Sequence, residues 1–166
     1  MFKRVDANID LPSVESEISA YWDKINAFET SVENRKNDKT FRFYDGPPFP
    51  TGSPHYGNLL AGVIKDIVPR YWTMRGYYVE RRFGWDVHGL PIEMEVQKKL
   101  NLEDPHQIDE YGIDKFNEAC RSQVQTNTEN WEKITRKIGR WVDFENDYKT
   151  MDIEFMESVW WVFKEL

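Results

Sequence analysis

The sequence predicts an α/β fold, a Rossmann-like half-domain with parallel strands, preceded by an N-terminal helix and followed by a helical C-terminal segment. Residues 40–44 alternate apolar and polar side chains and are rich in aromatic groups, as in a short strand. From residue 59 to residue 72 apolar side chains recur every three or four positions, which predicts a helix. Residues 77–83 form a second apolar and aromatic run. The order strand, helix, strand predicts a right-handed parallel crossover.

The first segment of the chain, residues 1–39, is expected to hold one helix and a linker. Residues 1–10 are polar and predicted to be irregular. Pro12 stands where the first turn of a helix tolerates proline, and a helix should follow to about Phe28. The charged stretch 29–39 is interpreted as the linker.

The second segment, residues 40–100, is expected to form the first half of the Rossmann-like domain. Its main helix should begin near Asn58, and Pro69 removes one backbone hydrogen bond and should kink the helix or end it early. Gly76 is the expected stop. A short helix ending at Leu100 should follow, with its charged side chains outside. Those side chains are Glu93, Glu95, Lys98 and Lys99.

The third segment, residues 101–166, is expected to be a helical extension. A connection containing Pro105 leads to a long predicted helix over 113–138, which Gly139 should end. Asp152 is expected to cap a last helix that is dense in apolar and aromatic groups and lacks a stop signal. We expect this helix to be truncated and to contact a partner surface, so the chain looks like a fragment.

Composition limits the classes of function. The chain has 166 residues, of which 40% are hydrophobic and 15% aromatic, which suffices for one substantial core. A net charge of -7 opposes nonspecific binding to nucleic acid. A local cationic cluster is equally well explained as a solvated helix end, so we assign none of its residues to RNA. Its members are Lys65, Arg70, Arg75, Arg81 and Arg82.

Cysteine usage and hydropathy exclude further classes. The single cysteine, Cys120, excludes an internal disulfide and a Cys-x-x-Cys zinc site, and it is interpreted as a packed thiol in a helix. No apolar run is long enough to span a membrane, and no signal-peptide pattern is present. We therefore expect no membrane partner and a cytoplasmic location.

The loop 46–58 is the strongest candidate for a ligand site. It joins the first predicted strand to a helix start and delivers His55, Gly57 and Asn58 to that start. Unpaired N–H groups and the helix dipole favour a bound anion there, which predicts a phosphate site. Three plainer interpretations remain: a surface histidine, Asn58 as a helix cap, and an ordinary turn, because the spacing fits neither the P-loop nor the dinucleotide fingerprint.

A second loop, residues 84–91, follows the second predicted strand and should lie with the first loop beyond the carboxyl ends of the strands. Asp86 stands in it between Trp85 and Val87, and a partly buried carboxylate needs a cationic partner. That partner is either a ligand, or Arg81 or Arg82 in a salt bridge. A helix cap is the remaining alternative.

The two loops together resemble a known family. The pattern Pro-x-x-x-Gly-x-x-His-x-Gly-x from Pro48 to Asn58 is similar to the first signature of class I aminoacyl-tRNA synthetases, which usually ends His-x-Gly-His. The residues before it, Tyr-Asp-Gly-Pro-Pro, and the later Gly-Trp-Asp-x-His-Gly-Leu-Pro-x-Glu resemble the isoleucine branch, the isoleucyl-tRNA synthetases. Segments 140–144 and 147–152 also look like this family. Position 58 departs from the signature, because Asn58 stands where the second histidine is usual. Unlike a histidine, an amide cannot be cationic.

This resemblance implies an isoleucine–tRNA ligase in which ATP activates isoleucine to isoleucyl-adenylate before transfer to tRNA(Ile). It implies catalytic contacts to phosphates from His55 and Asn58, and Asp86 as the ligand of the isoleucine ammonium group. Mg²⁺ is expected on the ATP phosphates, with no metal bound by the chain itself. The implied ATP-binding residues are Pro48, Gly52, His55, Gly57 and Asn58, and the implied amino-acid-binding residues are Gly46, Pro47 and Asp86.

The family's second signature, Lys-Met-Ser-Lys-Ser, occurs nowhere in the sequence. The resemblance therefore implies the N-terminal part of a catalytic domain whose partner is the second half of that domain, and the chain alone is expected to be inactive or weakly active. Three alternatives remain: a non-catalytic lobe that binds ATP or an adenylate, a synthetase of another branched-chain amino acid such as valine, and a structural domain without a ligand.

Overall fold

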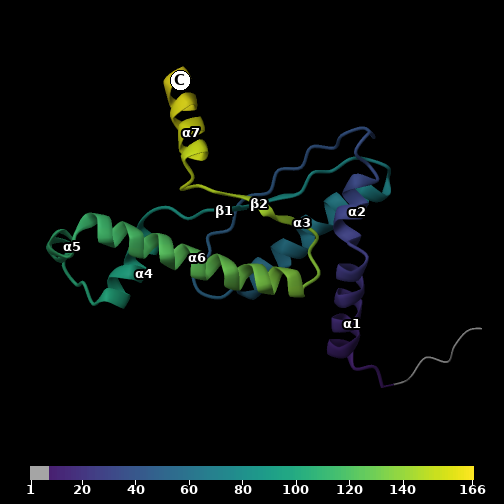
Figure 1. The fold of residues 1–166 in the computed structure, drawn as a ribbon, viewed down its shortest axis with the longest axis horizontal. Coiled ribbons are helices and arrows are strands. Elements are labelled where there is room, and N and C mark those ends of the chain that lie inside the picture. The colour runs from purple at the N-terminus through teal and green to yellow at the C-terminus, as the bar shows by residue number, and fades with distance from the viewer. Residues whose placement is uncertain (1–7) are drawn as a thin grey trace, which may run out of the picture. The chain divides into compact units, whose positions relative to one another are not determined.

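The computed structural model describes residues 8–166, and the expected irregular segment 1–10 lies mostly outside the described residues. The chain forms two compact units. One contains residues up to Arg42 together with Arg70–Glu80, and the other contains Phe43–Pro69 together with Arg81–Leu166. Figure 1 shows the helices and the two parallel strands along the chain, an α/β composition as predicted.

Two helices, α1 (Leu11–Lys24) and α2 (Ala27–Glu33), open the first unit. The prediction of one helix to Phe28 followed by a linker is wrong, because Asn26 adopts a left-handed conformation with φ 46° and separates two helices. Asparagine tolerates this conformation better than most residues, since its short polar side chain bonds locally. Part of the predicted linker is therefore helical.

The predicted first strand, residues 40–44, is reduced to a single parallel bridge between Thr40 and Tyr78. The amide of Phe41 donates to the carbonyl of Tyr78 at 2.9 Å, and the amide of Tyr78 donates to the carbonyl of Lys39 at 3.0 Å. The Phe41 ring stacks on Trp72 with centroids 4.7 Å apart. The predicted parallel pairing is thus present, but over a much shorter length than a strand.

The helix α3 (Tyr56–Met74) begins two residues before the predicted start and contributes residues to both units. Pro69 lies inside it without ending it, so an early end at this proline is wrong. The helix ends instead at Met74, two residues before Gly76, whose φ is 89°. There the amides of Gly76 and Tyr77 donate to the carbonyls of Thr73 and Trp72, which is the Schellman arrangement.

Two parallel strands, β1 (Arg82–Trp85) and β2 (Asp143–Lys149), form the sheet of the second unit. The prediction placed β1 earlier, at residues 77–83, and interpreted 143–149 as part of a helical extension, which is wrong. Strand β2 contains four acidic or basic side chains and acquires its conformation by pairing with β1. Such pairing is a tertiary interaction that local propensity does not reveal.

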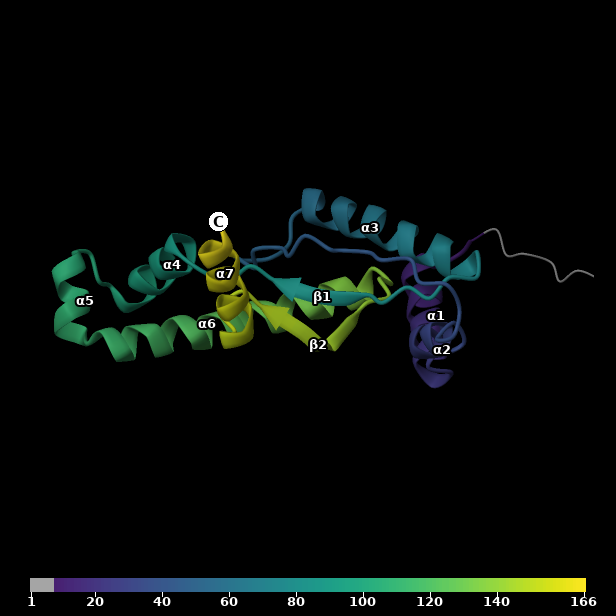
Figure 2. The same cartoon turned by 90° about the horizontal axis from the view of Figure 1, so that it is seen from above.

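Three helices pack with this sheet or with one another: α4 (Leu90–Leu100), α5 (Pro105–Tyr111) and α6 (Ile113–Lys137). Helix α6 runs alongside the strands in both views (Figures 1 and 2). The core joins side chains from β1, β2, α4 and α6. Its buried members are Phe83, Trp85, Val87, Ile92, Val96, Phe116, Val124, Trp131, Val142 and Phe144.

Helix α4 faces α6 partly through polar groups. The carboxylate of Glu95, which was expected outside, accepts hydrogen bonds from Gln123 at 2.9 Å and Asn127 at 3.3 Å. The short helix α5 was not predicted, although Asp104 and Gln107 form a capping box at its start. The long helix predicted over 113–138 is confirmed as α6.

The last helix, α7 (Ile153–Glu165), exposes its aromatic side chains, and Trp160 retains 69% of its accessible surface. The apolar side chains of α3, among them Leu60, Ile64 and Ile67, are also exposed. Across residues 8–166, none of the helices is both long enough and apolar enough to span a membrane.

Candidate functional site

The start of α3 is closed by its own side chains. The Nδ1 atom of His55 accepts the Gly57 amide at 3.1 Å, and the side-chain oxygen of Asn58 accepts the His55 amide at 3.0 Å. These reciprocal bonds resemble a capping box. Because Nδ1 acts as an acceptor, neutral His55 carries its proton on Nε2, and Asn58 keeps its amide N–H groups for another partner. Asn58 therefore contributes to the cap from the third position of the helix, with His55 and not Asn58 at the cap position, and both side chains retain a donor.

The two predicted loops are joined directly. The amide of Asp86 donates to the carbonyl of Pro48 at 2.9 Å, and the amide of Val87 donates to the hydroxyl of Thr150 at 2.9 Å. Each bond crosses between segments far apart in sequence. Loop 46–58 and the loop that contains Asp86 therefore lie side by side, as the sheet topology predicted.

The half-buried carboxylate of Asp86 has no ion pair or side-chain hydrogen bond within residues 8–166. The proposed salt bridges are not formed, because Arg81 donates to the carbonyl of Pro69 and Arg82 to the carbonyls of Asn146 and Asp147. The carboxylate of Asp86 remains available to a cation from outside this part of the chain.

A buried ion cluster lies at the beginning of loop 46–58. The side chain of Asp45 is 4% exposed and pairs with Arg140, which is 7% exposed. Lys65 Nζ lies 2.6 Å from Asp45 Oδ1 in ion-pair contact but outside hydrogen-bond geometry, and it donates to the carbonyl of Gly46 at 2.8 Å. One carboxylate faces two cations, so the cluster carries a net positive charge beside the loop.

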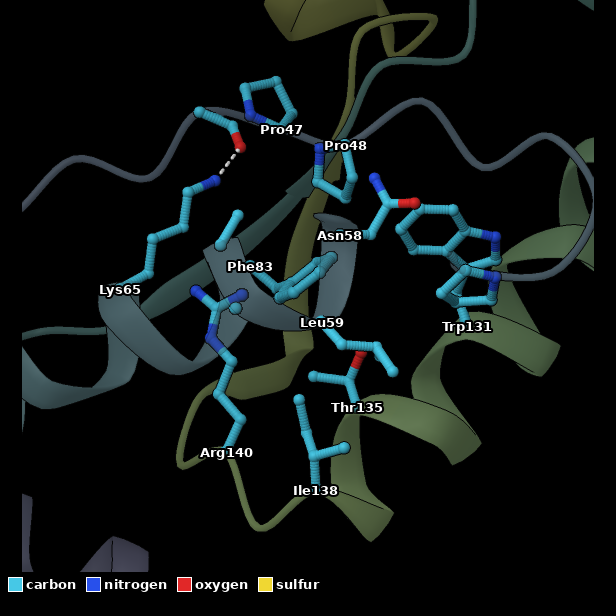
Figure 3. A pocket seen from close by; sticks show the side chains of 14 residues that line it. Pro47, Pro48, Asn58, Leu59, Lys65, Phe83, Trp131, Thr135, Ile138 and Arg140 are labelled. Carbon is cyan, nitrogen blue, oxygen red and sulfur yellow. Dashed lines mark hydrogen bonds between the residues drawn. The ribbon is translucent and has the colours of Figure 1, made fainter. Parts of the chain in front are cut away.

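A cavity of about 200 Å³ lies next to this cluster (Figure 3). In this view Lys65 and Arg140, its only ionisable lining residues, stand on one side and Trp131 on the other. Of the predicted site residues the cavity collects Gly46, Pro47, Pro48 and Asn58, and it does not include Gly52, His55, Gly57 or Asp86. The other lining residues are Pro54, Leu59, Ala61, Gly62, Phe83, Thr135 and Ile138.

Helix α6 reaches the same loop through Trp131. The indole Nε1 donates to the carbonyl of Gly52 at 2.8 Å, and the Trp131 side chain is buried. Gly52 has φ 57°, in the left-handed region that favours glycine. Sequence reasoning missed Asp45, Trp131 and Arg140 as parts of the site. Only Asp45 had a local signal, an acid directly before the Gly-Pro-Pro turn.

Two ionisable groups outside the predicted site have displaced pKa values. Burial raises the pKa of the Cys120 thiol, and the nearby charge of Glu93 raises it further. Burial also raises the pKa of Tyr148, with Asp45 adding to this rise and Arg82 opposing it. Among the described residues no group of three or more His, Cys, Asp or Glu side chains is arranged to hold a metal ion.

Comparison with known proteins identifies the family. The family model of class I tRNA synthetases (I, L, M and V) matches residues 17–166. This chain belongs to the class I tRNA synthetases. The resemblance deduced from the two loop motifs is thereby confirmed over nearly the whole synthetase chain.

Curated relatives of this synthetase chain include isoleucine–tRNA ligases from distant organisms. The enzyme of Treponema denticola is 52% identical over 166 residues, which is 100% of this chain and 15% of the relative. The cytoplasmic isoleucine–tRNA ligase of Arabidopsis thaliana is 55% identical over 93% of this chain and 13% of its own length. The cytoplasmic enzyme of Saccharomyces cerevisiae is 52% identical over 97% of this chain and 15% of its own length. The synthetase chain thus spans about one seventh of these relatives.

A solved structure shares the fold. The agnB2 LeuRS of Agrobacterium radiobacter K84, crystallised as a ternary complex with tRNA and LeuAMS, aligns with a TM-score of 0.66 at 21% identity. The alignment covers 96% of this synthetase chain and 18% of the LeuRS chain.

Proposed function

We propose that this chain is the N-terminal part of the catalytic domain of an isoleucine–tRNA ligase, which activates isoleucine with ATP and transfers it to tRNA(Ile). The observation that carries this proposal is 52–55% identity to isoleucine–tRNA ligases over 93–100% of the chain. The two parallel strands, and the separate parallel bridge between Thr40 and Tyr78, support a Rossmann-like half-domain within that catalytic domain.

The first step of the proposed reaction is attack by an isoleucine carboxylate oxygen on the α-phosphorus of ATP. The new P–O bond replaces the bond to pyrophosphate, and no covalent enzyme intermediate is needed. Catalysis then depends on positioning and on donors that stabilise the charge on the phosphoryl oxygens. Helix α3 supplies a positive helix end, and His55 Nε2–H and the Asn58 amide are its remaining side-chain donors.

The backbone of the loop completes the proposed nucleotide site. Gly57 is exposed and has no side chain at the helix start, and it is proposed to let the adenosine approach closely, although its N–H is already bonded to His55 Nδ1. Pro48 and Gly52 shape the loop before it. Mg²⁺ enters with the ATP phosphates as part of the substrate.

Asp86 is proposed to hold the ammonium group of isoleucine. Its unpaired, half-buried carboxylate supports this role, because a carboxylate in such a place gains most from a cationic ligand. Backbone groups of Gly46 and Pro47 would line the same site, and the Asp86–Pro48 hydrogen bond places the two loops at contact distance.

The proposed partners of the parent enzyme are ATP, isoleucine, tRNA(Ile) and the second half of the catalytic domain. The exposed aromatic face of α7 supports a further packed segment. A cytoplasmic location is proposed from the names of two relatives.

Calorimetric titration of the 166-residue chain with a non-hydrolysable isoleucyl-adenylate analogue, and with its valyl counterpart, tests this proposal. We expect binding that favours the isoleucyl analogue. Replacement Asp86→Asn should weaken that binding at least tenfold, because it removes a charge-assisted contact, while the melting temperature stays within about 2 °C.

The matched control is Asp109→Asn, the same chemical change on the exposed face of α5, which should leave affinity unchanged. Equal affinity for the two analogues would refute selectivity for isoleucine in this chain, and no binding by a sample with native circular dichroism would refute the assignment of the ligand sites to it. Equal loss of stability and affinity in Asp86→Asn would make Asp86 a structural residue.

A further inference from the structure

The loop that precedes α3 has little regular structure of its own. Residues 41–55 belong to no helix or strand, and the only backbone hydrogen bond within this described stretch runs from the amide of Thr51 to the carbonyl of Phe49 at 3.0 Å. The geometry of the loop must therefore be fixed by contacts from elsewhere.

One contact holds the later part of the loop. The indole of Trp131 is 5% exposed, and its N–H reaches the carbonyl of Gly52, 79 residues away in sequence. The positive φ of Gly52 lies three residues before His55, so this bond fixes the backbone directly ahead of the helix cap. The amide of Asn130 makes a longer contact of 3.5 Å to the hydroxyl of Ser53.

A second contact holds the beginning of the loop. Helix α6 ends in a Schellman turn at Gly139, where φ is 75° and the Arg140 amide donates to the carbonyl of Thr135. This turn sends Arg140 to Asp45, the residue directly before Gly46. The guanidinium also lies 5.2 Å from the centroid of the Phe83 ring, which limits its movement.

From these contacts we infer that the C-terminal half of α6 and the turn after it position loop 46–58, which carries the first signature motif (the signature loop), with Trp131 and Arg140 as positioning residues at its two ends. Trp131 sets the helix-cap end, where the proposed phosphate donors stand. Arg140, acting through Asp45, sets the Gly46 end, where the proposed amino-acid contacts stand. This inference rests on the proposed function for its effect on ligands, while the anchoring itself is independent of it.

Replacement Trp131→Phe tests the first anchor, because it keeps an aromatic ring and removes only the N–H donor. We expect amide hydrogen exchange at His55 and Gly57 to rise about three- to tenfold, the effect of one lost neutral hydrogen bond, while exchange in β1 and β2 is unchanged. Trp160→Phe is the matched control, the same change on the exposed face of α7. It should alter no exchange rate in the loop.

Ligand titrations separate the two anchors. Trp131→Phe should weaken the binding of AMP about three- to tenfold and the binding of isoleucinol by less than twofold. Arg140→Lys should weaken the binding of isoleucinol about three- to tenfold and the binding of AMP by less than twofold. If Trp131 and Arg140 contributed only to global stability, each variant would weaken the binding of both ligands equally. If the unaltered chain binds neither ligand, the proposed function fails while the exchange measurement still tests the anchoring.

A measurement on the unaltered chain guards against variants that do not fold. The Trp131 indole N–H should be protected from solvent exchange, and the Trp160 indole N–H should exchange like a free indole. Equal exchange of the two indole protons would overturn the inference. So would loop exchange rates that Trp131→Phe leaves unchanged, or that rise uniformly with those of the strands.

Discussion

At the scale of single residues, Gly84 shows how closely the two strands approach each other. It pairs with Tyr148, and a Cβ atom built on Gly84 would lie 2.2 Å from the Tyr148 ring carbon Cζ. The Tyr148 ring has two further contacts. It stacks on the Phe155 ring, and its centroid lies 5.6 Å from the Arg82 guanidinium. The ring therefore has little freedom to move aside.

We predict that Gly84→Ala lowers the free energy of unfolding by about 1–3 kcal/mol, the usual cost of overpacking a filled core. Urea denaturation followed by circular dichroism measures it. In the control, Gly62→Ala in α3, the new Cβ meets Ile138 Cδ1 at an ordinary 3.5 Å. The free energy of unfolding of Gly62→Ala should be unchanged or higher by up to about 1 kcal/mol, because alanine has the better helix propensity. Equal destabilisation in both variants would contradict the steric explanation.

Residues that carry local signals were predictable, and residues that act across long sequence distances were not. His55, Gly57 and Asn58 lie together where the loop meets α3, so glycine, proline and helix signals locate them. Asp45 and Arg140 are 95 residues apart, and no periodicity relates an arginine after a helix to an aspartate before a turn. The roles assigned to Asp86 and His55 toward ligands stay predictions.

At the scale of elements, α6 connects the core to the signature loop. Its apolar face packs under the strands, while Trp131 and the turn after it reach the loop. The length and stop of this helix followed from periodicity and Gly139. The break between α1 and α2 did not, because asparagine at position 26 signals a turn only weakly within an otherwise helical pattern. Strand β2 was not predicted either, because it acquires its conformation by pairing with β1.

The ion cluster that ties α6 to the loop gives a prediction at this scale. Asp45→Asn would leave the buried Arg140 without its counter-charge, and breaking a buried pair in this way costs about 3 kcal/mol. Thermal denaturation should show a clear fall in melting temperature. Asp38→Asn is the control, because the exposed Arg35–Asp38 pair contributes no more than about 1 kcal/mol. Equal losses would mean that burial of the cluster is energetically unimportant.

At the scale of the whole molecule, the chain leaves much apolar surface uncovered. The faces of α3 and α7 are both amphipathic and both largely exposed. Hydrophobic periodicity predicted each face correctly, but periodicity cannot say which segment covers a face. The curated relatives are about seven times as long as this chain, so additional segments are available in proteins of this family to cover such surfaces.

The dependence of stability on pH is also a property of the whole molecule. The pKa values of Cys120 and Tyr148 are both raised, so the folded state holds these protons more tightly than the unfolded state. This contribution is complete below the unfolded pKa values, about 8.5 for cysteine and 10 for tyrosine, and is lost as pH rises through the folded values.

We therefore predict that the free energy of unfolding falls as pH rises from about 8 to about 10, and that Cys120→Ala removes the earlier part of this fall. Urea titrations of the unaltered chain and of Cys120→Ala at several pH values measure the difference in their free energies of unfolding. A difference between them that is independent of pH would contradict the role of the thiol.

The long separation between the signature loop and its anchors has a consequence for synthesis. Asp45 leaves the ribosome 95 residues before Arg140, and Gly52 leaves it 79 residues before Trp131. At about 5–20 residues per second, the nascent chain carries its signature loop without either anchor for roughly 5–20 seconds. During that interval the loop is open to chaperones and proteases, and it becomes fixed only when the end of α6 emerges.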